Sequence, residues 1–212
     1  MKLIFNPDDS YIHKVLVTAH EAGVIDRLDF VALDPFGSET QIWKYSPLGK
    51  SPMLILDDGS PLYGGLQVCE YLDSLSSGAR LFPQGRERWR ALRLMVLGDA
   101  MFDATALMRV EGRRPRAEWH LDYLERERRK VLGALDEMAG EVSRFVGEPF
   151  HIGHVCMAGG ISYLDTRNPI KDLRLFPGDE SFSWRANRHA LTAWYDRIVL
   201  RPSLAFKLRL KR

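Results

Sequence analysis

One stretch of the chain, from Ser46 to Asp73, limits the possible fold more than any other. It opens with a turn-rich segment that contains two prolines and a glycine, which excludes the interior of a helix. A short apolar run, Met53–Leu56, is followed by the turn signal Asp57–Ser60 and a return segment at 61–63, a pattern that predicts an antiparallel hairpin. Apolar residues then recur with helical spacing up to Leu75, so a helix should follow the hairpin directly.

The residues before this stretch predict one more strand–helix–strand unit. We expect a strand at 2–5, a helix from Tyr11 that Gly23 ends, and a second strand at 28–33. A variable connection over 35–45 then leads into the hairpin. The resulting order is βαβ, connection, ββα, which is the arrangement of a thioredoxin-like α/β domain.

The second half of the chain reads as helical throughout. Serine, glycine and proline between 76 and 84 predict a linker. We therefore expect a thioredoxin-like domain over 1–77, a linker over 78–85 and a second domain over 86–212. Apolar residues with helical spacing predict long helices within this second domain, at 86–110, 117–146, 151–165 and 183–200. An all-α helical bundle follows from this pattern.

Composition and charge narrow the classes of function. A formal net charge of +2 is too small to favour a nucleic-acid partner. No apolar run approaches the roughly 20 residues that a membrane span needs, and the apolar part of the N-terminus is too short for a signal peptide. The two cysteines, Cys69 and Cys156, lie in apolar helical patterns, which favours a reducing compartment over a disulfide scaffold. We expect a cytoplasmic protein that binds neither nucleic acid nor membrane.

Several motifs resemble those of the bacterial glutathione transferases. Residues 46–52, Ser-Pro-Leu-Gly-Lys-Ser-Pro, resemble the family's N-P-x-G-K-x-P loop, whose last proline is cis, and residues 68–73 resemble the helix that follows its hairpin. Residues 161–167 resemble the L-x-Y-L-D-x-R end of the family's central helix, and 191–195 with 201–203 resemble its closing segments. The resemblance spans nearly the whole chain. It implies a thioredoxin-like domain followed by an all-α bundle, assembled as a homodimer.

The resemblance also locates a glutathione site and shows a departure from it. In the family, the residue before the cis-proline offers its backbone to glutathione, which places Lys50, Ser51 and Pro52 at the site. A Glu-Ser pair at the start of the next helix holds the γ-glutamyl group, but this chain has Gly64 and Gly65 there. Each lost charge-assisted hydrogen bond is worth roughly 1.5–3 kcal/mol. We therefore expect a degraded glutathione site.

The family's thiol-activating residue falls in the loop before the first helix. Alignment through Tyr11 and Lys14 puts this position on Asp9, whose carboxylate would repel a thiolate instead of stabilising it. Ser10 or Tyr11 could take the role if the loop shifts by one residue. The alternative interpretation is that Asp8, Asp9 or Ser10 simply caps the first helix.

Two histidines, His151 and His154, stand where the family starts its central helix with Ser/Thr-x-x-Asp. They could form a metal pair, but no third ligand stands nearby, and zinc sites need three or four ligands. We expect the two histidines to start the helix or to contact a partner, and we expect no metal site.

The C-terminal tail alternates basic and apolar residues. It is either a loose end that packs on the bundle or a docking segment for an acidic partner, with positive charges at Lys207, Arg209, Lys211 and Arg212.

Two functions fit these observations. Our first interpretation is a protein that keeps the transferase fold but has lost its cofactor and works as a binding or adaptor protein. Non-catalytic relatives of this kind include bacterial ones that bind the cell-division polymer FtsZ. The alternative is an active glutathione transferase that conjugates glutathione to small electrophiles, with glutathione as its cosubstrate.

Overall fold

A computed structural model of the chain describes residues 1–7, 11–35, 37, 39–78 and 80–206. The chain forms two compact units. Unit 1 comprises Met1–Gln84 together with the segment that starts at Pro202, and unit 2 comprises Gly85–Arg201. The expected domains assigned everything after the linker to the second unit, so this return of the chain to unit 1 was not anticipated.

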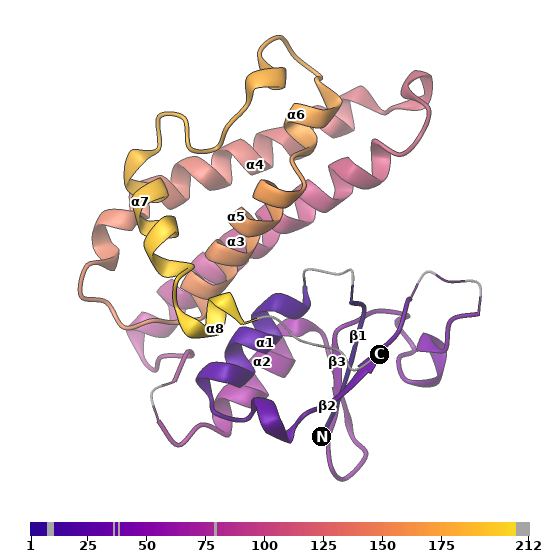
Figure 1. Cartoon of the computed structure of the whole chain (residues 1–212), viewed down its shortest axis with the longest axis vertical. Helices are drawn as coiled ribbons and strands as arrows, with labels where there is room; N and C mark the ends of the chain where they lie inside the picture. The colour runs from indigo at the N-terminus through magenta and orange to yellow at the C-terminus, as the bar shows by residue number, and fades with distance from the viewer. Residues whose placement is uncertain (8–10, 36, 38, 79, 207–212) are drawn as a thin grey trace. The chain divides into compact units, whose positions relative to one another are not determined.

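Unit 1 is built on one mixed four-stranded sheet (Figure 1). Strand β1 pairs in parallel with β2 and antiparallel with β3, and β3 pairs antiparallel with β4. The strand order is therefore β2-β1-β3-β4, with β1 (Lys2–Phe5), β2 (Asp29–Ala32), β3 (Met53–Ile55) and β4 (Pro61–Tyr63). This sheet, with the helices described next, confirms the predicted thioredoxin-like fold.

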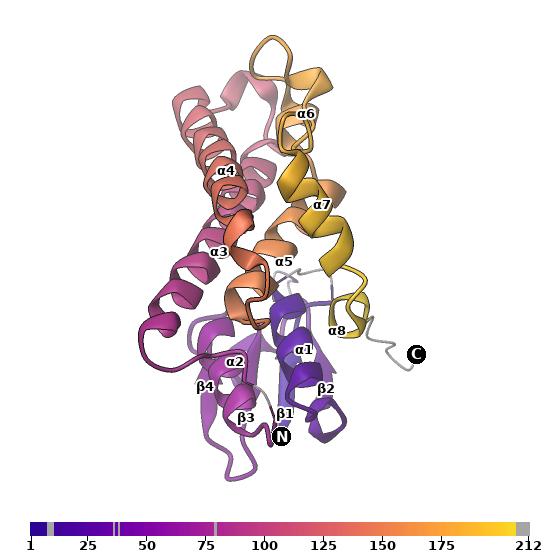
Figure 2. The same cartoon turned by 90° about the vertical axis from the view of Figure 1, so that its left-hand side faces the viewer.

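Both faces of the sheet are covered. Helices α1 (Ile12–Glu21) and α2 (Gly65–Ser74) lie side by side over one face (Figure 2). On β1 and β3, neighbouring side chains point to opposite faces, and the cluster of Ile4, Met53 and Ile42 fills the face away from the helices. Ile42 belongs to a 3-10 turn in the connection after β2, which therefore closes the core of unit 1.

The short helix α8 (Pro202–Ala205) packs on α1 within unit 1. The Ser203 hydroxyl donates a hydrogen bond to the Glu21 carboxylate, and Leu204 is buried. The Phe206 ring lies against His20, with 5.6 Å between ring centroids. These contacts hold residues 202–206 to the first unit.

Unit 2 is an all-α bundle. Its helices are α3 (Arg86–Glu111), α4 (Leu121–Glu141), α5 (Ile152–Thr166), α6 (Pro169–Leu173) and α7 (His189–Ile198). Helices α3 and α5 approach each other very closely at Gly98. A Cβ atom added to this glycine would lie 2.3 Å from the backbone of Cys156. The mostly apolar α5 is buried along nearly its whole length, as the central helix of the resemblance should be.

Two predicted helices are shorter than expected. The predicted helix over 117–146 begins only at Leu121, because Trp119 has an extended backbone. The predicted helix over 183–200 begins at His189, because Asn187 has a φ of 61°, which no α-helix accommodates. Both cysteines are buried, and they do not form a disulfide with each other, as expected.

Within the described part of the chain, every helix is too short or too polar to cross a bilayer. The cytoplasmic location stays a prediction. The basic tail residues Lys207, Arg209, Lys211 and Arg212 lie outside the described residues, so their role as a partner-binding segment also stays a prediction.

Two truncations distinguish the contribution of helix α8 to stability from that of the tail that follows it. Removing residues 202–212 should lower the melting temperature by several degrees, because it deletes the buried Leu204 and the Ser203–Glu21 hydrogen bond. Removing only 207–212 should leave the melting temperature unchanged. Differential scanning calorimetry on both truncations checks this, and equal losses would show that the tail itself stabilises the fold.

Candidate functional site

Strand register brings the predicted glutathione-site residues to one edge of the sheet. Met53 of β3 pairs with Tyr63 of β4, so the residues just beyond them, Pro52 and Gly64, lie next to each other at the open end of the hairpin. Met53 also pairs with Ile4, so the chain leaves β1 at the same edge. The Ser51–Pro52 peptide bond is cis, as the resemblance implies.

A side chain is disfavoured at Gly64 by the backbone conformation and at Gly65 by lack of space. Gly64 caps α2 with φ 82° and ψ 145°, a backbone conformation that is almost restricted to glycine, although a Cβ atom would meet nothing within 4 Å. Gly65 has ordinary dihedral angles, but the Lys14 side chain fills the space in front of it. A Cβ atom at Gly65 would lie 2.5 Å from Lys14 Cε and 3.4 Å from Nζ.

The Lys14 ammonium therefore lies beside the first residue of α2. A helix begins with N–H groups that have no acceptor inside the helix, and its N-terminus carries partial positive charge. Gly64 has no side chain with which to cap these groups. The N–H groups of α2 and the Lys14 ammonium together form a positive site that suits a carboxylate.

Of the three candidates for thiol activation, only Tyr11 is among the described residues. Tyr11 precedes α1 with helical dihedral angles, and its side chain does not cap the helix. Lys14 Nζ lies 5.8 Å from the centre of the Tyr11 ring, so Tyr11, Lys14 and Gly65 form one group. Asp9 and Ser10 lie outside the described residues, and their proposed roles stay predictions.

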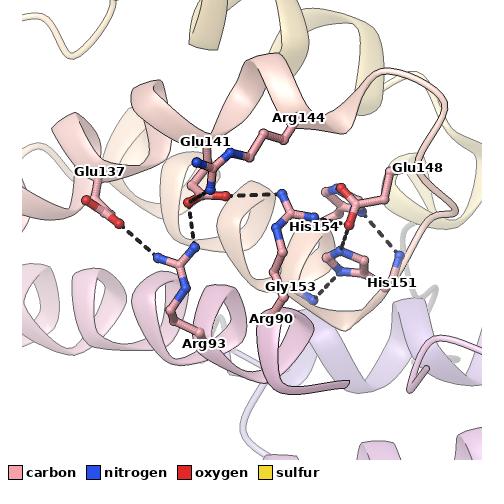
Figure 3. A network of polar contacts seen from close by, with 9 residues as sticks. All are labelled: Arg90, Arg93, Glu137, Glu141, Arg144, Glu148, His151, Gly153 and His154. Carbon is pink, nitrogen blue, oxygen red and sulfur yellow. Dashed lines mark hydrogen bonds and ion pairs between the residues drawn. The ribbon is translucent and has the colours of Figure 1, made fainter. Parts of the chain in front are cut away.

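A second polar cluster lies at the start of α5 in unit 2 (Figure 3). His151 caps the helix: its Nδ1 accepts a hydrogen bond from the Gly153 N–H at 3.1 Å. The His154 Nδ1 accepts from the His151 N–H at 3.2 Å, which completes a capping box made of two histidines. The helix start that we expected at these residues is observed.

The Glu148 carboxylate faces both imidazole rings. It lies 3.0 Å from His151 Nε2 and 3.7 Å from His154 Nε2, so a third potential ligand does stand near the two histidines. Our expectation that no such group is near was wrong. The sequence signal was present, since Glu148, His151 and His154 follow one another at intervals of three residues.

The hydrogen bonds nevertheless argue against a metal at this cluster. Both Nδ1 atoms accept backbone N–H groups, so in the neutral rings both protons reside on Nε2. A metal at Nε2 needs a lone pair there, and metal-bound histidines usually donate a hydrogen bond from the other ring nitrogen. Glu148 is also bound to the Arg90 guanidinium, whose charge disfavours a cation. The arrangement is that of a structural cap.

Ion pairs connect this cap to the helices around it (Figure 3). Arg90 of α3 bonds Glu148 and, at 3.1 Å, Glu141 at the end of α4. Arg93 reaches Glu141 at 2.5 Å and Glu137 at 2.8 Å. Burial opposes the charge on Glu141, but hydrogen bonds from Arg93 and Arg90 outweigh it and lower the pKa of Glu141. The network therefore joins α3, α4 and α5.

Burial also changes the titration of the two histidines. It lowers the pKa of His154 to about 3, with further lowering by the positive charges of His151, Arg90 and Arg201. Burial lowers the pKa of His151 as well, although Glu148 partly offsets this effect. Both rings are therefore neutral in the folded protein at neutral pH, as their role as acceptors requires.

Comparisons with known proteins agree with the fold. The sequence model of the family described as "Glutathione S-transferase, N-terminal domain" matches residues 10–75. A glutathione transferase family member from Pseudomonas fluorescens Pf-5, solved with bound glutathione, is 34% identical with a TM-score of 0.84, and the match covers 96% of each chain. A second structure of a family member from this organism, with bound S-(propanoic acid)-glutathione, is 33% identical over 97% of each chain, with a TM-score of 0.80.

A further relative is described as a GST-like protein. The uncharacterized GST-like protein YibF of Escherichia coli (strain K12) is 24% identical over 208 residues, which is 97% of this chain and 96% of that protein. The full-length similarity to solved family members shows that this chain belongs to the glutathione transferase family.

Acid should destabilise unit 2 through the histidine cap. Because the pKa of His154 falls from 6.5 in the unfolded chain to about 3 in the folded one, its contribution to stability is complete above pH 6.5 and declines as the pH falls toward 3. At pH 5 the loss from His154 alone is about 2 kcal/mol. Urea unfolding at pH 7 and at pH 5 measures this loss. Between these two pH values, His154→Asn and His151→Asn should each lose less free energy of unfolding than the parent protein does.

The matched control is His120→Asn, an exposed histidine that caps α4 in the same way. It should leave the pH dependence unchanged. If the two buried variants lose as much stability between pH 7 and pH 5 as the parent, the cap is not the acid-sensitive element.

Proposed function

We propose that this protein binds glutathione at the sheet edge of unit 1 and transfers it to small electrophiles, with Lys14 binding the γ-glutamyl carboxylate where the family uses a Glu-Ser pair to hold the γ-glutamyl group. The observation that carries the proposal is the position of the Lys14 ammonium beside Gly65, at the N-terminus of α2. The partial positive charge of the helix N-terminus and the Lys14 ammonium both attract an anion to this point. The γ-glutamyl end of glutathione carries such a carboxylate.

The surrounding geometry supports the same ligand. The cis peptide at Ser51–Pro52 places the backbone of Ser51 at the edge where Gly64 begins α2. Lys50 is exposed next to it. Structures of family members that are 33–34% identical to this chain contain glutathione or a glutathione conjugate. The site is therefore better described as rebuilt than as simply degraded.

A binding or adaptor role without catalysis is the second candidate. The observation that favours it is the absence of side chains at Gly64 and Gly65, which removes two of the family's contacts with the γ-glutamyl group. Under this proposal Lys14 merely fills the space of the missing serine. A partner such as a cell-division polymer would then be the ligand. The two candidates differ in whether glutathione binds.

Replacing Lys14 tests the proposed carboxylate contact. Isothermal titration of Lys14→Met with glutathione should give a dissociation constant at least about tenfold higher than that of the parent protein, because a charge-assisted contact is worth roughly 1.5–3 kcal/mol. Lys44→Met, which removes an exposed charge in the 3-10 turn after β2, is the matched control and should bind like the parent.

The same titration decides between the two candidates. If the parent protein shows no saturable binding of glutathione, the transferase proposal fails and the adaptor role gains support. If Lys14→Met binds as tightly as the parent, glutathione binds without the help of Lys14.

Substitutions in the loop before α1 identify the residue that activates the thiol. If Ser10 or Tyr11 hydrogen-bonds the thiolate, Ser10→Ala or Tyr11→Phe should lower kcat with a chlorodinitrobenzene substrate by about a hundredfold at saturating glutathione. Asp9→Ser should raise kcat or leave it unchanged, because it removes a negative charge near the thiolate. A complete loss of activity in Asp9→Ser would instead give the carboxylate a catalytic role.

A further inference from the structure

One end of unit 2 concentrates basic side chains. Two segments meet there, 109–116 at the end of α3 and 167–174 around α6 (Figure 2). Together they contain seven basic residues and two acidic ones, whereas the whole chain has a net charge of only +2. The basic residues are Arg109, Arg113, Arg114, Arg116, Arg167, Lys171 and Arg174, and the acidic ones are Glu111 and Asp172.

Three contacts hold the two segments together. The Arg116 guanidinium donates a hydrogen bond to the Leu173 carbonyl at 3.4 Å. A Cβ atom added to Gly112 would lie 2.5 Å from Leu173 Cδ2, so the end of α3 is in close contact with α6. The Arg109 guanidinium donates to the Tyr163 hydroxyl at 2.6 Å, which links α3 to the helix that precedes α6.

Exposed positive charges lie around these contacts. Arg113 directly follows Gly112 and Arg174 directly follows Leu173, so the packing of α6 on α3 brings their backbones close together. Lys171 is exposed on α6, three residues before Arg174. We call four exposed residues the basic end of unit 2: Arg113, Arg116, Lys171 and Arg174.

Arginines elsewhere in unit 2 are paired with carboxylates. Arg90, Arg128 and Arg185 each form a salt bridge with a glutamate or an aspartate. At the basic end this pattern changes. Among the described residues, Arg114 is the only one of the seven basic side chains that forms a salt bridge. Carboxylates of the described chain therefore leave most of this positive charge unpaired.

Neutral contacts nevertheless hold one of these arginines in place. The Arg116 guanidinium lies over the Trp119 ring, 4.9 Å from its centre, in addition to its bond to the Leu173 carbonyl. These contacts orient the guanidinium without removing its charge. A side chain held in this way loses little conformational freedom when a carboxylate binds to it.

Arg174 is unusual for a second reason. It ends α6 with a φ of 51° and a ψ of 55°, a left-handed conformation in which glycine is the usual residue after a helix. Backbone conformation therefore does not explain the choice of arginine. The arginine instead places an exposed positive side chain beside the contact between α3 and α6.

We propose that the basic end of unit 2 binds an acidic segment of another protein, with Arg113, Arg116 and Arg174 bonding its aspartate or glutamate side chains. A guanidinium suits a carboxylate because two parallel N–H groups can bind both oxygens. Unpaired charges of one sign also attract a partner of the opposite sign and fix its orientation. The Trp119 ring, which could otherwise stack on a nucleobase, is already covered by Arg116, which argues against single-stranded nucleic acid.

Fluorescence anisotropy with a labelled acidic peptide tests this proposal. The probe is a fluorescein-labelled oligoglutamate peptide, titrated with the full chain in the absence of glutathione, so the outcome is independent of the proposed function. The parent protein should bind the probe saturably. The dissociation constant should rise at least about threefold when NaCl is raised from about 50 to about 300 mM, because salt screens the attraction.

Two substitutions identify the residues that bind the probe. Arg174→Gly should raise the dissociation constant by about threefold or more while it maintains or raises the melting temperature, because glycine suits the left-handed backbone. A loss of folding cannot explain weaker binding by a variant that is at least as stable as the parent. Arg113→Glu reverses a charge and should raise the dissociation constant by about tenfold or more.

The matched control is Arg197→Glu. Arg197 is an exposed arginine on α7, which packs on the 3-10 turn that follows α4, whereas the basic end lies near the start of α4. This variant should bind the probe like the parent protein.

Four outcomes would overturn the proposal. The first is a parent protein that does not bind the probe saturably, and the second is equally tight binding by Arg113→Glu and Arg174→Gly. The third is a loss that occurs only when residues 207–212 are removed, because it would place the binding on the tail. The fourth is tighter binding of a single-stranded oligonucleotide that the same two substitutions weaken, because it would assign this surface to nucleic acid.

Discussion

The pairing of β3 with both β1 and β4 is the constraint on which the candidate glutathione site depends. Because Met53 stands opposite Ile4 on one side and Tyr63 on the other, the cis-proline, the end of β1 and the start of α2 meet at one sheet edge. A slip of one residue in either pairing would turn every side chain of β3 to the opposite face. The buried cluster of Ile4, Ile42 and Met53 fixes this register.

At this sheet edge, the chain lacks the two side chains of the family's Glu-Ser pair and has the Lys14 side chain instead. Gly64 has a backbone conformation that disfavours any other residue, and Gly65 gives its space to Lys14. The exchange brings a cationic side chain from the first turn of α1 to the start of α2. Both helices cover the same face of the sheet, so a residue on one can serve the N-terminus of the other.

In unit 2, helix α3 is held by close backbone contacts and by ion pairs. Close contact between α3 and α5 through Gly98 and Gly160 buries the inner face of α3, and the ion pairs of Arg90 and Arg93 connect it to the end of α4. These contacts pack α3 against α4 and α5.

The fold could be predicted from the sequence, whereas the side-chain contacts at the candidate site could not. Motifs such as the loop before Pro52 combine turn residues in an order that only a few folds use. Such a motif therefore predicts the fold around it as well as the turn itself. Lys14 contributed to the alignment, but nothing in its sequence position indicated that its side chain crosses to Gly65. Likewise, Glu148 acts on two histidines through a loop whose path depends on tertiary packing.

The claim that Lys14 and the start of α2 recognise a carboxylate is central to this account. Amide NMR spectra recorded during addition of glutathione measure it most directly. The account predicts that the largest shifts arise at Gly64, Gly65 and Leu66, and that Lys14→Met greatly reduces these shifts while the Lys44→Met variant retains them. Shifts that leave these three amides unchanged, or that persist fully in Lys14→Met, would contradict it.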